Sequence, residues 1–170
     1  DFIRMSALTA ICGGCGPFNI GAKQGRRPKP SETLNLAIIG CGPMGDGNMK
    51  AFMRDPRIRV THVCDPIAES PYHGYDAKTP HGRDVFKRKV DKFYDTTATK
   101  SVADFREVID DPTVDAVQIS TGDYWHAPLG VAAMKAGKHV YCQKPMTLGI
   151  SEGWAMIAAA KEHGVTFQEI

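Results

Sequence analysis

The sequence lacks a strong excess of charge, a long apolar run and a dense set of cysteines. Its 21 basic and 19 acidic residues leave a formal net charge of +2, which gives no electrostatic basis for binding nucleic acid or a membrane surface. No apolar run is long enough to cross a bilayer. Five cysteines in 170 residues do not suggest a disulfide framework, and we expect those at strand ends, Cys41, Cys64 and Cys142, to be buried free thiols.

What is present is an ordinary globular composition with no internal repeat. Hydrophobic residues make up 42% and charged residues 24% of the chain, whose length suits one well-buried domain rather than two. The first 33 residues differ from the rest, and the regular pattern of strands and helices starts at residue 34. We therefore predict one domain over residues 34–170, preceded by a linker at 23–33 and a separate segment at 1–22.

The most informative stretch runs from residue 34 to residue 65. An apolar run at 34–39 leads directly into Gly-Cys-Gly-Pro-Met-Gly, a G-x-G-x-x-G motif at the point where a strand turns into a helix. The helix is expected to stop at Asp55-Pro56. A second apolar run ends in Asp65, about twenty residues after Gly45. This order of strand, turn, helix, strand and acid is the dinucleotide-binding fingerprint.

Each part of the fingerprint has a physical reason. Gly40 permits the tight turn, Gly42 lets the backbone approach a pyrophosphate, and Gly45 lets the helix pack close to the strand. The helix N-terminus offers unpaired N–H groups and the positive end of its dipole to phosphates. Asp65 can accept hydrogen bonds from the ribose hydroxyls of the adenosine. The predicted cofactor-binding residues of this stretch are Gly40, Cys41, Gly42, Pro43, Met44, Gly45, Asp65 and Pro66.

Strands and helices alternate along the rest of the chain. Apolar spacing predicts helices at 83–94, 102–109, 127–136 and 154–163, and short apolar runs predict strands at 114–119, at 139–142 and from 165. Their short connections imply an α/β fold of the Rossmann type, a doubly wound parallel sheet with helices on both faces.

The polar stretch between residues 66 and 99 leaves alternatives open. The basic run at 87–89 is either the solvated face of a helix or a clamp for a 2′-phosphate. His73 and His81 lie among turn formers at a spacing too loose for a metal site, so we expect both at the surface.

Ligands of such a sheet bind beyond the carboxyl ends of the strands, where two further polar clusters occur. In the first, Thr121 and Gly122 can lie against the nicotinamide or its ribose, and His126 is either an acid–base group or a helix residue that bonds locally. In the second, Lys144 can orient a hydroxyl or carbonyl, although composition alone favours an exposed lysine without a role.

Four stretches together resemble the Gfo/Idh/MocA family of oxidoreductases. They are GCGPMG, the Cys64-Asp65-Pro66 strand end, SVADFREVI, and TGDYWHAPLGVAAMKAGKHVYCQKPMTL. The most distinctive are the family's T-P-x-x-x-H and E-K-P motifs, which read here as TGDYWH and QKP. Gly122 replaces the usual proline, and Gln143 replaces the usual glutamate with a neutral group that can still hydrogen-bond a ribose.

The resemblance implies a cofactor and roles for several residues. It makes Lys144 a catalytic or substrate-orienting lysine and places His126 in the pocket on the nicotinamide side. The cofactor is expected to be NAD, with NADP possible, because Asp65 repels a 2′-phosphate and no arginine is adjacent to it in sequence. No metal site is predicted. The further cofactor-binding residues expected are Ser120, Thr121, Gly122, His126, Gln143 and Lys144.

The resemblance also implies hydride transfer between a nicotinamide cofactor and a sugar, polyol or related cyclic alcohol. Two alternatives stay open: an NAD-recycling glycoside-cleaving enzyme of the same family, and a non-catalytic nucleotide- or ligand-binding module. Family members are longer and carry a C-terminal α/β domain through which they form oligomers. The present chain is therefore expected to be a fragment that is inactive alone, part of a homo-oligomer with a carbohydrate-like substrate.

The first 22 residues are either the remnant of an export signal or a disordered tail. Asp1-Phe2-Ile3-Arg4 resembles the end of a twin-arginine signal, which implies a periplasmic protein, whereas a plain tail implies a cytoplasmic one. Cys12 and Cys15 have C-x-x-C spacing but lack a second ligand pair, so we expect neither a metal nor a redox role.

Overall fold

The computed structural model describes residues 33–71 and 79–170. The interpretations of residues 1–22, of Cys12 and Cys15, of nearly all of the linker and of His73 concern residues outside these ranges. The described elements are β1 (Leu34–Ile39), α1 (Pro43–Met53), β2 (Ile58–Cys64), α2 (Arg83–Tyr94), β3 (Lys100–Val102), α3 (Phe105–Asp110), β4 (Ala116–Ile119), the 3₁₀ helix η2 (Asp123–Trp125), α4 (His126–Lys135), β5 (His139–Cys142), α5 (Ile150–His163) and β6 (Phe167–Glu169).

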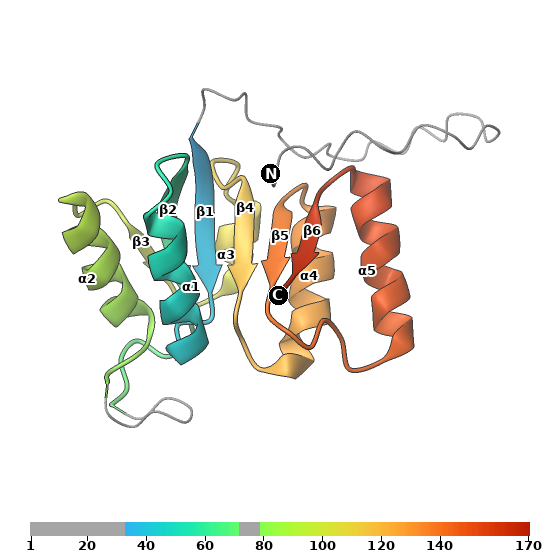
Figure 1. The fold of residues 1–170 in the computed structure, drawn as a ribbon, viewed down its shortest axis with the longest axis horizontal. Helices are drawn as coiled ribbons and strands as arrows, with labels where there is room; N and C mark the ends of the chain where they lie inside the picture. The colour runs from blue at the N-terminus through green and yellow to red at the C-terminus, as the bar shows by residue number, and fades with distance from the viewer. Residues whose placement is uncertain (1–32, 72–78) are drawn as a thin grey trace.

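The six strands form one sheet in the order β3-β2-β1-β4-β5-β6, and each neighbouring pair runs parallel (Figure 1). The order reverses between β1 and β4, so the chain winds outward first to one side of β1 and then to the other. This arrangement confirms the predicted doubly wound α/β fold of the Rossmann type. It also puts all the strand-to-helix loops at one edge of the sheet.

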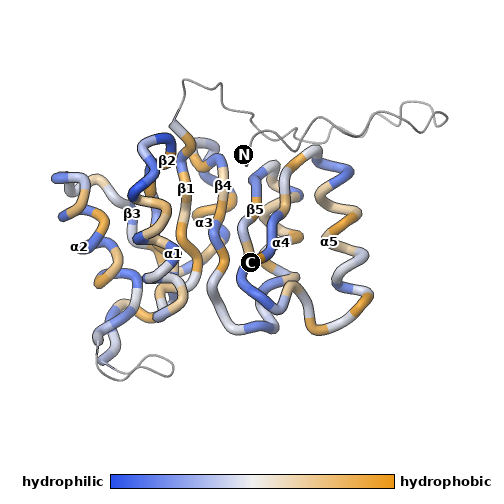
Figure 2. Tube along the Cα trace, viewed as in Figure 1, coloured by the Kyte–Doolittle hydropathy of each residue, from blue (hydrophilic) through white to orange (hydrophobic). Residues whose placement is uncertain are grey.

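The alternation of side chains along β1 divides the core between two layers of helices. Leu36 and Ile38 pack with α1 and α2, whereas Ala37 and Ile39 pack with α3, α4 and α5. Because successive side chains of a strand point to opposite faces, a strand that is apolar at every position must be covered on both sides. In Figure 2, β1 accordingly lies in the apolar colours between the two helix layers.

The structure corrects the prediction at Val102, which belongs to a strand and not to the following helix. Val102 ends β3 and pairs with Cys64 of β2. The strand has only three residues, Lys100–Val102, none of them buried, so no period-two pattern could reveal it. Its pairing with β2 depends on the tertiary fold, in which α2 returns the chain to the sheet edge.

His81 is a second correction, because it is buried and not at the surface. Only 2% of it is exposed. Ser70 and His81 exchange two main-chain hydrogen bonds of 2.9 and 3.0 Å, and the imidazole lies 6.4 Å from the Phe86 ring, centroid to centroid. The turn-rich sequence suggested exposure, but this antiparallel bridge holds His81 near Phe86 of α2.

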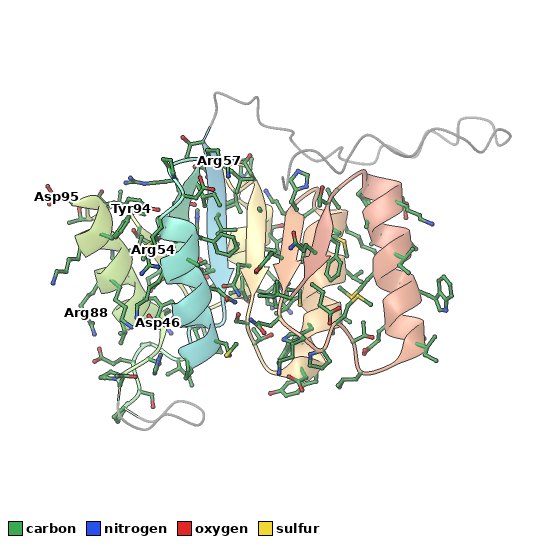
Figure 3. The ribbon with its side chains drawn as sticks, viewed as in Figure 1. Asp46, Arg54, Arg57, Arg88, Tyr94 and Asp95 are labelled. Atoms are coloured by element: carbon green, nitrogen blue, oxygen red, sulfur yellow. The ribbon has the colours of Figure 1, made fainter. Side chains whose placement is uncertain are left out.

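The basic run of α2 is engaged in contacts within the protein. Lys89 forms a 2.6 Å ion pair with Asp46, which lies on the side of α1 facing α2 (Figure 3). Lys87 donates to Asp91 and to the carbonyl oxygens of Thr97 and Thr99. These contacts favour the helix-face interpretation of residues 87–89 over a phosphate clamp.

Candidate functional site

A cleft of about 1120 Å³ opens at the edge where the five strands β1 to β5 end. Most of the predicted site residues line it, from both halves of the sheet: Gly40, Gly42, Pro43, Met44, Asp65, Pro66, Ser120, Thr121, Gly122, His126, Gln143 and Lys144. Cys41 and Gly45 do not line the cleft; both are buried in the turn beneath it. The tertiary fold thus brings together four clusters that are far apart in the sequence.

The glycine turn is tightly packed against the rest of the sheet. Gly40 has a φ of +95°, and a Cβ atom on it would lie 2.5 Å from the carbonyl oxygen of Ser120. A Cβ atom on Gly45 would lie 2.2 Å from the carbonyl oxygen of Gly40. Any side chain at these two positions would push the first turn of α1 away from the ends of β1 and β4.

The start of α1 presents hydrogen-bond donors to the cleft. Gly42 is the N-cap and has no side chain to accept from the first turn, and Pro43 has no N–H group. The first main-chain bond of the helix runs from the N–H of Asp46 to the oxygen of Gly42, at 2.9 Å. The N–H groups of Met44 and Gly45 precede that bond and have no partner inside the helix. A helix start of this kind is suited to an anionic group such as a diphosphate.

Asp65 connects the end of β2 to the glycine turn. Its Oδ2 accepts from the N–H of Cys41 at 2.8 Å, and its Oδ1 accepts from the N–H of Ile67 at 2.9 Å. Only 6% of the residue is exposed, although it borders the cleft. The carboxylate therefore stabilises the conformation of the glycine turn. The sequence predicted only a contact between Asp65 and a ligand.

An arginine that is distant in sequence supports the same loop. Nη1 of Arg83, the first residue of α2, donates to the carbonyl oxygens of Asp65 and Pro66 at 3.1 and 2.8 Å. The sequence around Asp65 gave no sign of this contact, because Arg83 lies 18 residues further along the chain. A positive charge thus lies behind the main chain at the end of β2.

The cysteines near the cleft are buried free thiols, as predicted. Burial, reinforced by the charge of Asp65, raises the pKa of Cys41 far above its ordinary value. Burial likewise raises the pKa of Cys64 and that of Cys142 to about 12. Burial at these positions therefore disfavours the thiolate, which is the nucleophilic form of cysteine.

His126, the first residue of α4, connects the loops that follow β4 and β5. Its Nδ1 lies 2.7 Å from the carbonyl oxygen of Pro145, and its Nε2 lies 3.2 Å from that of Thr121. The residue is only 1% exposed. Because both ring nitrogens face main-chain oxygens, this geometry favours a positioning role for His126 over direct proton transfer.

Lys144 and Gln143 follow β5 at the other end of the cleft from Asp65. Lys144 is exposed, and its peptide bond to Pro145 is cis. Gln143 is 7% exposed, and its main-chain N–H donates to the oxygen of Ile119 at 2.9 Å. Among the described residues that follow β5 and line this cleft, Lys144 is the one with a basic side chain.

The structure adds residues that sequence reasoning missed. Asn48 of α1 and Gln118 of β4 both donate from their side-chain amides to Oγ of Ser120, Asn48 at 3.2 Å. One side of the cleft is formed by residues 103–106 after β3 and by residues 123–125 of η2. The first of these segments was not assigned to the site because β3 was not predicted. Its position directly after a strand is the signal that could have placed it there.

No three His, Cys, Asp or Glu side chains in residues 33–71 and 79–170 are grouped as metal ligands would be. No helix in the same ranges has the length and apolarity needed to cross a membrane.

Comparison with known proteins gives one family. The family model described as "Oxidoreductase family, NAD-binding Rossmann fold", which is the Gfo/Idh/MocA model, matches residues 34–170. The chain belongs to this family. The match confirms the resemblance found in the sequence and the expected NAD(P) class of cofactor.

Individual proteins are similar to this chain in sequence or in structure. A levoglucosan dehydrogenase from Pseudarthrobacter phenanthrenivorans is 40% identical over 139 residues, which are 79% of this chain and 32% of the relative. A glycosyl hydrolase family 109 protein from Solibacter usitatus is 26% identical over 161 residues, covering 92% of this chain and 35% of the relative. An NAD-binding oxidoreductase from Klebsiella pneumoniae has a similar structure, with a TM-score of 0.63, 26% identity, and coverage of 81% of this chain and 34% of the other. The chain thus spans about a third of the length of these Gfo/Idh/MocA relatives.

Proposed function

We propose that this chain is the cofactor-binding domain of an oxidoreductase that moves a hydride between NAD and a sugar, polyol or related cyclic alcohol. One observation carries the proposal: the glycine turn and the Lys144 side chain border the same cleft, with β4 between their strands. Neighbouring strands lie about 4.8 Å apart, so the ends of β1 and β5 are separated by about 10 Å. A diphosphate at the turn and a reacting group beside the lysine fit this separation.

The residues of the cleft divide into two groups around the turn. The main chain at Gly42 and Met44, at the start of α1, would hold the diphosphate, and Asp65 with Pro66 would contact the adenosine ribose. Ser120, Thr121 and Gln143 would contact the nicotinamide ribose on the other side. When bound, the cofactor supplies or accepts a hydride at its nicotinamide ring.

Lys144 would act on the substrate oxygen. An ammonium group there donates a hydrogen bond to a carbonyl or hydroxyl oxygen and stabilises negative charge as the C–H bond of the carbinol breaks or forms. It can also give or take the proton of that oxygen.

We propose that His126 holds the Thr121 and Pro145 loops at the correct separation. The variant His126→Asn should lower stability and cofactor affinity while leaving the pH dependence of kcat unchanged. A shift in that pH profile would instead show that the imidazole transfers protons.

Titration calorimetry of the 170-residue chain with NAD and NADP tests the proposal. We expect NAD to bind at least about 10-fold more tightly, because the Asp65 carboxylate at the end of β2 repels a 2′-phosphate. Tighter binding of NADP would reverse the assigned preference. Absence of binding by either nucleotide, in a chain with a folded circular-dichroism spectrum, would overturn the proposed function.

A second candidate function is glycoside cleavage with a recycled, tightly held NAD. It is favoured by the glycosyl hydrolase family 109 relative, whose match covers 92% of this chain. Release of free sugar from an aryl glycoside without added NAD, by the protein that carries this domain, would support it. Strict dependence on added NAD, with a keto sugar as product, would support the dehydrogenase instead.

A non-catalytic binding module is the remaining alternative, favoured by Gln143 in place of a charged residue. It predicts that the protein carrying this domain binds NAD and a sugar but turns over neither.

We further propose export through the twin-arginine-like start and assembly as a homo-oligomer. Cell fractionation and light scattering of the same protein test these two points.

A further inference from the structure

Two of the described residues that line the cleft carry sulfur, and they differ sharply in accessibility. Met44, the second residue of α1, is 56% exposed. Cys64, at the end of β2, is 2% exposed. The thioether of Met44 is therefore the sulfur group that a small reagent in solution reaches first at this edge of the sheet.

The other methionines in the described ranges are less accessible than Met44. Four of them are buried, each with at most 7% exposed: Met49, Met53, Met134 and Met156. Met146 is half-buried and lines a separate groove beside the start of α5. Because the oxidation of methionine follows its exposure, an oxidant should modify Met44 before the buried four.

The chemistry of the two kinds of sulfur also favours the methionine. A cysteine reacts with an oxidant as its thiolate, and burial raises the pKa of Cys64 to about 12. A thioether has no proton on its sulfur, so its oxidation requires no deprotonation. The buried thiols near the glycine turn are thus protected where the exposed thioether is not.

The position of Met44 connects its oxidation to anion binding. Gly42 and Met44 border the cleft at the start of α1, where the helix presents hydrogen-bond donors and the positive end of its dipole. Oxidation converts the apolar side chain into a polar one, whose sulfoxide oxygen carries partial negative charge. That oxygen would compete with a diphosphate for the donors of the helix start and would repel its negative charge.

The fold should survive oxidation at this position. Met44 is more than half exposed and belongs to neither of the two buried clusters of the core. Oxidation of Met49, which is fully buried against the sheet, would instead place a polar oxygen in the core and destabilise the domain. Loss of binding without loss of structure is therefore the result specific to Met44.

We propose that Met44 is an oxidation-sensitive site through which peroxides weaken dinucleotide binding. Hydrogen peroxide transfers one oxygen atom to the sulfur: the O–O bond breaks, an S–O bond forms, the sulfur loses two electrons, and the peroxide is reduced to water. Methionine sulfoxide reductases reverse the change, with thiols as the reductant. The effect on binding rests on the proposed function, whereas the order in which the methionines are oxidised does not.

Peptide mapping by mass spectrometry tests the order of oxidation without any cofactor. The 170-residue chain is treated with increasing doses of hydrogen peroxide. We expect Met44 to gain an oxygen at lower doses than Met134 or Met156, with an unchanged circular-dichroism spectrum, and fragment spectra to assign that oxygen to Met44 and not to Met49. Oxidation of the buried methionines as readily as Met44, in a chain that is still folded, would overturn the proposal.

Calorimetry with NAD, before treatment and after removal of the peroxide, measures the effect on binding. The affinity of the unmodified chain should fall about 10-fold, as expected for the loss of one hydrogen bond to a charged group. A methionine sulfoxide reductase with dithiothreitol should restore it.

Two variants identify the methionine responsible, each compared with itself before and after treatment. Met44→Leu should keep the affinity that it had before peroxide. The matched control Met146→Leu retains Met44 and should lose as much affinity as the unmodified chain.

The outcomes distinguish this inference from the function on which it rests. If the untreated chain does not bind NAD, the proposed function fails and its coupling to peroxide fails with it, while peptide mapping still decides whether Met44 is oxidised first. If NAD binds and Met44→Leu loses affinity as the unmodified chain does, another residue is responsible and the proposal is wrong. Full affinity in a chain whose Met44 is oxidised would contradict it as well.

Discussion

Replacing Asp65 with asparagine separates a structural role of this residue from its expected role in binding. Both carboxylate oxygens accept main-chain N–H groups, from Cys41 at 2.8 Å and from Ile67 at 2.9 Å. Asparagine keeps one oxygen and turns an NH₂ group toward the other N–H. One charge-assisted hydrogen bond is lost and a donor in the glycine turn is left unpaired, at a combined cost of about 2–4 kcal/mol.

Urea unfolding of the cofactor-free chain measures this cost. With a slope of about 2 kcal/mol per M, Asp65→Asn should lower the midpoint by about 1–2 M. Asp104→Asn is the matched control, because Asp104 caps α3 through the N–H of Arg106 and asparagine caps a helix equally well. We expect the control to change stability by less than about 0.5 kcal/mol.

Equal stability of the two variants would refute the reasoning. It would mean that the bonds from Asp65 to the glycine turn contribute nothing net to folding. Asp65 would then be a ligand contact only, as the sequence fingerprint alone suggests.

Three further changes probe the turn, the lysine and the sheet. Gly40→Ala should cost about 1–3 kcal/mol and abolish NAD binding in calorimetry, since φ is +95° and a Cβ would lie 2.5 Å from a main-chain oxygen; Gly47→Ala, with open space around the added atom, should do neither. Lys144→Ala should lower kcat of the protein carrying this domain about 100-fold or more while NAD affinity changes less than about 3-fold; unchanged turnover would exclude the proposed role. Burial, reinforced by the charge of Lys100, lowers the pKa of His62 below its usual 6.5. As the pH falls, the imidazole of His62 is protonated in the unfolded chain before it is protonated in the folded chain. The folding stability that depends on neutral His62 is therefore fully present above about pH 6.5 and is lost as the pH falls below that value. Urea midpoints measured at pH 7.5 and pH 5.5 should therefore differ more for the unmodified chain than for His62→Gln, and equal differences would contradict this.

Local patterns were enough to predict most of the fold. The apolar run of β1, the glycine motif and the stop at Asp55-Pro56 each involve contacts between near neighbours in sequence, so a strand, a turn and a helix could be placed from residue types alone. The same holds for the helix at 83–94, which the structure gives the same bounds. The rule that parallel strands present their ligand sites at one edge then brought Ser120 and Lys144 to a single cleft with Asp65.

Partners distant in sequence could not be predicted in this way. β3 has too few residues for any period and exists because β2 offers it an edge. His81 is buried by a bridge to Ser70, and Asp65 is occupied by main-chain groups that only the closed turn brings within reach. The rings of Phe105 and Trp125, which are on separate loops, lie 6.3 Å apart only because η2 and the start of α3 border the same cleft. Residue types thus predicted which edge of the sheet forms the cleft, whereas the packing of the loops determined which side chains line it.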